Sequence, residues 1–168
     1  MSYLKHFRLT DDLIADLTPL VTTNKSAFLQ SRYTGFVSVS AVTVYELAIK
    51  DILCNFGNQK HKVLGNFARF HFDRINGRIK FDSLCNEYVR RFGEKYRTRF
   101  KKNVDLSRRQ VLRDQGKDIV TSYNNIVLWR HTFAHEGLTP TNATYQDVIE
   151  SYELGKSIIE CLSKSMHR

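Results

Sequence analysis

The chain has 168 residues, of which 42% are hydrophobic and 26% charged, and this is enough for one domain with its own core. Two prolines and eight glycines argue against long linkers, and no apolar run approaches the ~20 residues of a membrane span. The first residues lack the apolar stretch of a signal peptide, and the three cysteines form no Cys-x-x-Cys motif. We expect a single domain over residues 1–168, cytoplasmic, with reduced and mostly buried thiols and no membrane contact.

The positive charge is concentrated in one third of the chain. The formal net charge is +9 at pH 7, and residues 69–113 contain fourteen Lys or Arg against five Asp or Glu. This segment carries the whole excess, which suits an anionic polymer such as RNA. The alternative is a solvated helix face that only aids solubility.

A first helix is expected from Thr10, because its hydroxyl can cap a helix N-terminus and acidic residues follow it. Three leucines have helical spacing behind this cap: Leu13, Leu17 and Leu20. Residues 24–33 are typical of a polar connection or of a short helix.

Residues 36–56 are ambiguous at first, since four of them are β-branched valines that suit a strand. The later residues favour a helix, because apolar side chains recur there at spacings of three and four. These residues are Val42, Tyr45, Ile49, Ile52 and Leu53. We expect one long, largely buried helix that ends near Gly57.

Another helix is expected over residues 62–75, followed by a turn at Asn76-Gly77. A helix that begins at Asp82 or Ser83 then carries one large apolar residue in every fourth position: Leu84, Tyr88, Phe92, Tyr96 and Phe100. Cations lie between them, and six are candidate RNA contacts: Arg90, Arg91, Arg97, Arg99, Lys101 and Lys102. Aromatic rings and cations can bind RNA by stacking, but the register favours core packing with the cations facing water.

The last two helices are expected over residues 117–135 and from Thr144 to about residue 164. Gly137 is the expected C-terminal stop of the first. Thr144 and Asp147 resemble a capping box at the start of the second.

The hexapeptide Arg130-His131-Thr132-Phe133-Ala134-His135 contains the most distinctive chemistry of the chain. A guanidinium suits phosphate, and an imidazole exchanges protons near neutral pH. RNA brings its own nucleophile, the 2′-hydroxyl, so a base, an acid and a cation are sufficient to cleave it without a metal or cofactor. Arg130 and His135 are about 140° apart on an ideal helix and converge only if the last turn loosens.

Three structural alternatives remain open. Arg130 and His135 can cap the orphan carbonyls of a helix end. His131 and His135, four residues apart, can hold a metal with Glu136, although Thr132 stands where metalloproteases carry glutamate. Glu46, within the buried helix, can pair with an arginine instead of serving catalysis.

Residues 128–137, with their Arg-x4-His spacing and Ala-His-x-Gly ending, resemble the signature of the HEPN superfamily. Residues 42–50 are similar to the buried second helix of its RiboL-PSP type. The resemblance implies an all-α, HEPN-like bundle of about five to six helices with antiparallel core helices. It also implies a homodimer whose paired motifs form a cleft.

By the same resemblance, the expected activity is metal-independent RNA cleavage that leaves a 2′,3′-cyclic phosphate. Arg130 and His135 are the matching catalytic pair, with His131 and Glu46 as accessory residues. Many relatives act in toxin–antitoxin or antiphage systems, so an antitoxin or defence partner is expected. The alternatives are a non-catalytic HEPN module that binds RNA, a nucleotide or a partner protein, and a purely structural helical adaptor.

Overall fold

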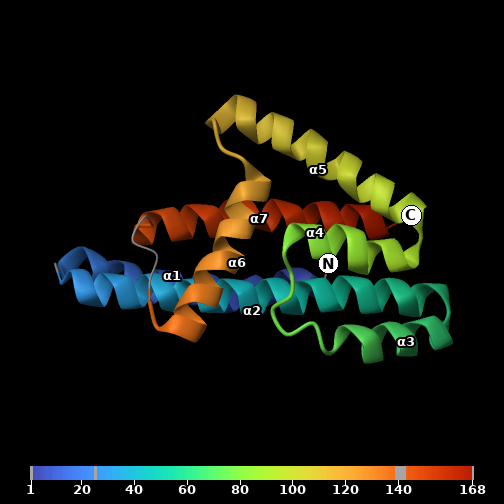
Figure 1. Ribbon diagram of the computed structural model, residues 1–168, viewed down its shortest axis with the longest axis horizontal. Helices are drawn as coiled ribbons and strands as arrows, with labels where there is room; N and C mark the ends of the chain where they lie inside the picture. Colours follow the sequence, from blue (N-terminus) through green and yellow to red (C-terminus); the bar gives the residue numbers. More distant parts are fainter. Residues whose placement is uncertain (1, 25, 139–142, 168) are drawn as a thin grey trace.

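The chain folds into a bundle of helices (Figure 1), seen in a computed structural model that describes residues 2–24, 26–138 and 143–167. The elements are η1 (Ser2–Phe7), α1 (Arg8–Thr23), α2 (Ala27–Lys60), α3 (Lys62–Phe72), α4 (Phe81–Ser83), η2 (Leu84–Tyr88), η3 (Val89–Phe92), α5 (Glu94–Gln115), α6 (Ile119–Glu136) and α7 (Tyr145–Met166). These ranges contain no strand and seven α-helices, which confirms the all-α prediction with one helix more than expected. The extra helix is α4, a three-residue turn. Within the described ranges, no helix has both the length and the apolar character that crossing a bilayer requires.

Two long helices, α2 and α7, lie side by side at the centre of the bundle (Figure 1). They run in the same direction, since Tyr45 meets Tyr152 at one point and Phe56 shares a pocket with Met166 further along. The expected antiparallel packing is found between α1 and α2, between α2 and α3, and between α5 and α7. Helix α6 crosses α2 and α7 steeply, so its two ends lie far apart on the molecule.

The first helix begins earlier than its sequence predicted. Thr10 is not its cap but a fully buried residue inside α1, where its hydroxyl lies 2.7 Å from that of Ser40. No side-chain cap stands at Phe7, because the η1 turn runs directly into α1. Of the three predicted leucines, Leu17 is buried, whereas Leu20 is 50% exposed.

Helix α2 confirms the long buried helix and extends it at both ends. Residues 27–33, left open between connection and helix, form its first turns behind the N-cap Ser26. The valines do not form a strand: Val37, Val42 and Val44 are buried in the helix. Their β-branched side chains fit because this segment is covered by α1, α6 and α7.

The single helix expected from Asp82 through Phe100 is interrupted at Gly93. The chain passes through α4, a π-helical turn (η2) and a 3-10 turn (η3) before α5 begins. Gly93 has a φ of 116°, a conformation that L side chains rarely adopt, so a glycine is required at this break. The aromatic stripe still points inward, with Phe56 packed against Phe92 and Tyr96 at ring-centroid distances of 5.3 and 4.8 Å, which confirms core packing.

Three stacked tyrosines connect the central helices. Tyr45 stacks on Tyr123 and on Tyr152, with ring centroids 5.3 and 5.7 Å apart. Burial raises the pKa of Tyr45 and of Tyr123, so both hydroxyls remain donors. Tyr45 donates to the carbonyl of Tyr152 and Tyr123 to that of Ile79, each at 2.6 Å. The second bond ties the segment before α4 to α6.

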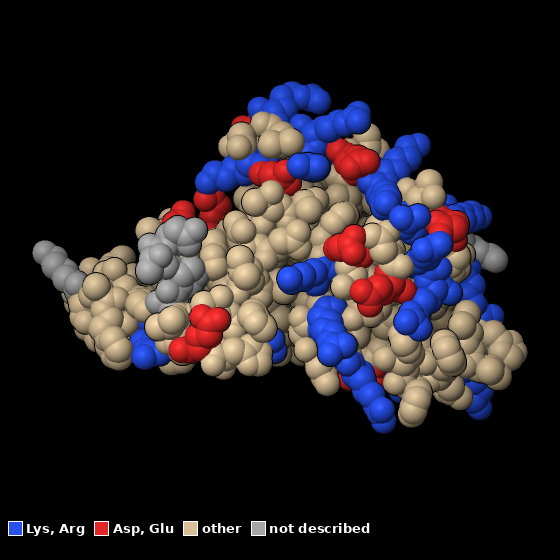
Figure 2. All heavy atoms as spheres, in the orientation of Figure 1, with Lys and Arg blue, Asp and Glu red and all other residues tan. Residues whose placement is uncertain are grey.

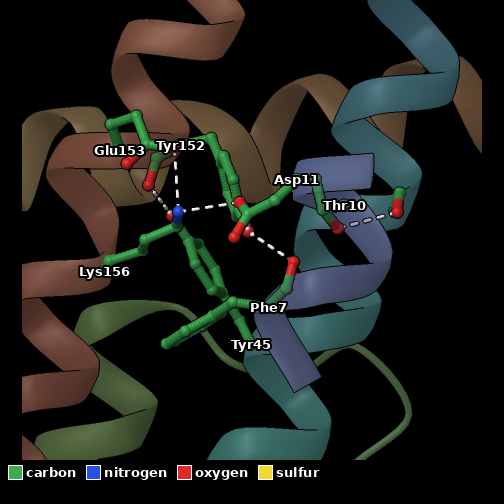
Figure 3. Close-up of polar contacts among 8 residues, drawn as sticks. Phe7, Thr10, Asp11, Tyr45, Tyr152, Glu153 and Lys156 are labelled. Atoms are coloured by element: carbon green, nitrogen blue, oxygen red, sulfur yellow. Dashed lines mark hydrogen bonds and ion pairs between the residues drawn. The ribbon is translucent and has the colours of Figure 1, made fainter. Parts of the chain in front are cut away.

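Figure 3 shows how the N-terminal helices are attached to α7. The hydroxyl of Tyr152 donates to Asp11 at 2.9 Å and lies 3.2 Å from the carbonyl oxygen of Phe7. The ammonium of Lys156 contacts Asp11 and Glu153, each at 2.8 Å, above the ring of Tyr152. The three cysteines are free thiols, and Cys85 and Cys161 are buried, as expected.

Candidate active site

An aromatic side chain, Phe133, packs the end of α6 against α2. Gly137, with a φ of 65°, stops the helix as predicted, and its N–H donates to the carbonyl of Phe133 at 3.0 Å. The ring of Phe133 covers Gly35 so closely that a Cβ there would lie 2.2 Å from it. Because Phe133 faces α2, His131 and His135 point to solvent.

The carbonyl of Gly137, just past this helix end, is bonded without the motif. Arg32 of α2 donates to the carbonyl of Gly137 at 2.9 Å, and its guanidinium lies over the ring of Phe28. Among the described residues, neither Arg130 nor His135 hydrogen-bonds a carbonyl there. The capping interpretation therefore does not explain why these two residues stand at the helix end.

Arg130 lies against the predicted Asn76-Gly77 turn. Gly77 has a φ of 77°, and a Cβ at this position would lie 2.9 Å from Nη1 of Arg130 and 3.0 Å from its Cζ. The glycine therefore lets the guanidinium rest directly on the backbone. Within the described ranges, no carboxylate forms an ion pair with Arg130.

The segment after this turn is fixed by four hydrogen bonds from different parts of the bundle. Their donors and acceptors are Gly77 N–H to Glu46 Oε2 (2.6 Å), Tyr88 hydroxyl to Arg78 carbonyl (2.7 Å), Tyr123 hydroxyl to Ile79 carbonyl (2.6 Å) and Phe81 N–H to Asn124 Oδ1 (3.0 Å). Such anchoring removes most of the conformational freedom of the segment. The side chains of residues 78–80 therefore extend from a rigid backbone opposite α6.

Glu46 is part of this anchoring. Its second oxygen contacts the ammonium of Lys50 at 2.8 Å, and Lys50 also donates to the carbonyl of Asp73 at 3.0 Å. The side chain is 16% exposed and does not line the space beside Arg130. Glu46 therefore pairs with a lysine and not with an arginine. Its other oxygen positions Gly77.

A groove of about 330 Å³ separates residues 77–80 from α6, and we call it the α6 groove. Its polar lining consists of Arg78, Lys80, Ser83, Glu87, Arg130 and His131. Arg78 and Lys80 were absent from the candidate list, although both lie in the basic segment. The signal that identifies them is their place directly after the predicted Asn76-Gly77 turn.

The two histidines of the motif are neighbours, and only one lines the α6 groove. The ring centroids of His131 and His135 are 4.6 Å apart, one helical turn from each other. His131 lines the groove beside Arg130, whereas His135 adjoins it through His131. Among the described residues, no three His, Cys, Asp or Glu side chains gather where a metal ion could be held.

The six candidate RNA contacts of residues 90–102 are placed differently. Arg90 and Arg97 pair with Glu94 at 2.6 and 3.1 Å, and the hydrogen bond from Arg97, with Arg90 nearby, lowers the pKa of Glu94. Arg91 donates to the carbonyl of Glu87 at 3.1 Å. Arg99 donates to the carbonyl of His167 at 2.7 Å and caps the end of α7.

Of these six, Lys101 and Lys102 are exposed on α5 without an ion pair or a side-chain hydrogen bond among the described residues. Figure 2 shows the same mixture, with Asp and Glu atoms interspersed among those of Lys and Arg over the right half of the molecule. None of the six lines the α6 groove, although Arg91 bonds the backbone of Glu87, which does.

The family model RiboL-PSP-HEPN matches residues 6–167. No curated protein and no solved structure matches the chain. Of the short loop expected before α7, residues 139–142 lie outside the described residues.

Proposed function

The chain belongs to the RiboL-PSP-HEPN family, and from this premise we propose that it is a metal-independent endoribonuclease whose catalytic residues are Arg130 and His135. The observation that carries the proposal is the state of Arg130. Its guanidinium is fixed against Gly77, half-buried, and has no carboxylate partner among the described residues. A cation that is held in place but not neutralised is available to a phosphate.

The reaction follows from what RNA supplies. A base removes the proton of the 2′-hydroxyl, and the 2′-oxygen forms a bond to the adjacent phosphorus. The bond from phosphorus to the 5′-oxygen breaks, and an acid gives that oxygen a proton. The products are a 2′,3′-cyclic phosphate and a 5′-hydroxyl. Arg130 would neutralise charge on the phosphate oxygens, and His135 would transfer protons, each worth roughly 10²–10⁴-fold in rate.

A homodimer completes this proposal. One imidazole does not reach both sides of a phosphorus atom, so His135 from two subunits would serve as base and acid. The surface around the motif supports such contact, because large apolar side chains are exposed near it: Phe28 (64%), Phe36 (48%), Leu128 (51%) and Leu138 (61%). An exposed apolar patch next to a polar site is typical of an interface. Sedimentation equilibrium of the wild-type chain tests the dimer.

We extend the proposal to a toxin or antiphage effector with an antitoxin or defence partner, because many HEPN relatives have this role. The exposed and concentrated positive charge suits RNA as the target. A module that binds RNA without cutting it is the alternative that the following experiment separates.

The test is cleavage of labelled RNA in EDTA by the wild type and by His135→Ala. We expect the wild type to cut and the variant to lose cleavage while retaining RNA binding. His167→Ala, which removes another exposed histidine, is the matched control and should cut normally. Equal cleavage by His135→Ala would overturn the catalytic assignment. Binding without cleavage by the wild type would indicate the non-catalytic module.

A further inference from the structure

The α6 groove carries more positive charge than the motif itself explains. Arg78 and Lys80 line it together with Arg130, and both of their side chains are exposed. Within the described ranges, neither Arg78 nor Lys80 forms an ion pair. By contrast, Arg90 and Arg97, later in the same basic segment, are both paired with Glu94. Two unpaired cations of this segment therefore lie in the groove beside the motif.

The backbone that carries these two cations is fixed before any ligand arrives. The carbonyls of Arg78 and Ile79 are held by the hydroxyls of Tyr88 and Tyr123, and the latter is fully buried. A ligand that binds such a segment pays little for ordering its backbone. Because this backbone is rigid, Arg78 and Lys80 are better ordered for ligand binding than lysines on an ordinary surface patch.

The lining of the α6 groove also contains a negatively charged residue. Glu87 is the carboxylate among the described lining residues, and the hydroxyl of Ser83 lies 3.0 Å from its Oε1. A phosphate avoids a carboxylate, whereas the N–H groups on the edge of a base donate to one. Cations together with one carboxylate therefore suit a nucleotide better than a bare phosphate.

The size of the groove narrows the ligand further. A volume of about 330 Å³ is at the lower end of the ~300–1,000 Å³ typical of small-molecule sites. One nucleotide of a flexible strand can enter such a space. In a duplex the base edges are paired, and proteins read single-stranded RNA through bases that are splayed out.

We propose that the α6 groove binds one nucleotide of single-stranded RNA next to the cleaved bond, with Arg78 and Lys80 on its phosphate. Glu87 accepts a hydrogen bond from the base of that nucleotide. The inference rests on the proposed function for the position of the cleaved bond, and its test is a binding measurement that needs no cleavage.

The experiment measures fluorescence anisotropy of a labelled single-stranded RNA in EDTA, in the His135→Ala background, over a series of salt concentrations. Arg78→Ala/Lys80→Ala should weaken binding about tenfold, as expected for two lost charge-assisted contacts. It should also reduce the salt slope by about 0.7, since the two cations contact one phosphate and each neutralised phosphate of a single strand contributes about 0.7.

The matched control is Arg109→Ala/Arg113→Ala, which removes the same charge from exposed positions of α5. It should weaken binding less than about twofold, because it changes only the long-range field. An equal loss in both double variants, or no loss in the first, overturns the inference. Equal affinity of the wild type for a duplex of the same sequence does so as well. If the wild type cuts no RNA but only Arg78→Ala/Lys80→Ala loses binding, the endoribonuclease proposal fails and the groove stands.

Discussion

Two basic regions of this protein differ in what their cations do. On α5 and the turn before it, Arg90 and Arg97 are paired with Glu94, and Arg99 caps α7. In the α6 groove, Arg78 and Arg130 face open space without an acidic partner among the described residues. The first region has more positive residues, several of which are bonded to the protein itself, whereas the lysine and arginines that line the groove have no acidic partner among the described residues.

A count of charges along a chain therefore does not locate a binding site. An arginine whose hydrogen bonds go to its own protein contributes to stability, and its field is partly cancelled. An arginine held by packing alone keeps its hydrogen-bonding capacity for a ligand. This distinction ranks the expected effects of the following substitutions.

The largest effect is expected for Gly77→Ala. The new Cβ would lie within 3.0 Å of the guanidinium of Arg130 and would displace it. A displacement of about 1 Å can cost roughly a hundredfold in rate, so RNA cleavage should fall by about ten- to a hundredfold in kcat/KM.

Gly116→Ala is the control for Gly77→Ala. Gly116 has a similar φ of 67°, but nothing lies within 4 Å of its Cβ position. Both variants should lose about 1–2 kcal/mol of unfolding free energy from backbone strain, and only Gly77→Ala should lose cleavage. Similar activities of the two variants would show that the contact with Arg130 is unimportant.

A medium effect on stability is expected for Arg99→Ala. The guanidinium donates to the carbonyls of Ser165 and His167, and the side chain is half-buried. Urea denaturation should show a loss of about 1–2 kcal/mol, while RNA cleavage at a temperature where the variant is folded should not change. Weaker RNA binding at unchanged stability would instead place Arg99 in the RNA site.

The smallest effect is expected for Lys101→Ala/Lys102→Ala. Both lysines are exposed, so they attract RNA only through the long-range field. Binding should weaken about two- to threefold at low salt and should equal that of the wild type at high salt. A loss as large as that of Arg78→Ala/Lys80→Ala would make α5 the main RNA surface.

The fold could be predicted from periodicity and caps wherever local chemistry decides it. Gly137 ends α6, and Thr144 with Asp147 forms the predicted capping box of α7. Local signals failed where tertiary contacts decide. Thr10 resembles a cap but is buried against Ser40, and the helix expected through Gly93 breaks there, where the chain turns so that α5 can pack on α7.

The sequence identifies the residues of the motif and the turn, but not that they lie together in the candidate site. Arg130 and His135 attract attention by their spacing, and the Asn76-Gly77 turn is evident by itself. That the two segments meet depends on Tyr123, Glu46 and Asn124, each of which fixes the turn segment through a long-range hydrogen bond. No periodicity in one chain reports such a contact, so only their place directly after the Asn76-Gly77 turn distinguishes Arg78 and Lys80 from the other cations.

The most direct test of the central claim uses RNA that lacks its own nucleophile. An all-ribose oligonucleotide and the same sequence with one 2′-deoxynucleotide at the cleaved position are incubated with wild-type protein in EDTA. We expect the first to be cut, leaving a 2′,3′-cyclic phosphate, and the second to be intact at that position. Equal cutting of both, or no cutting of either, would contradict an Arg130–His135 ribonuclease.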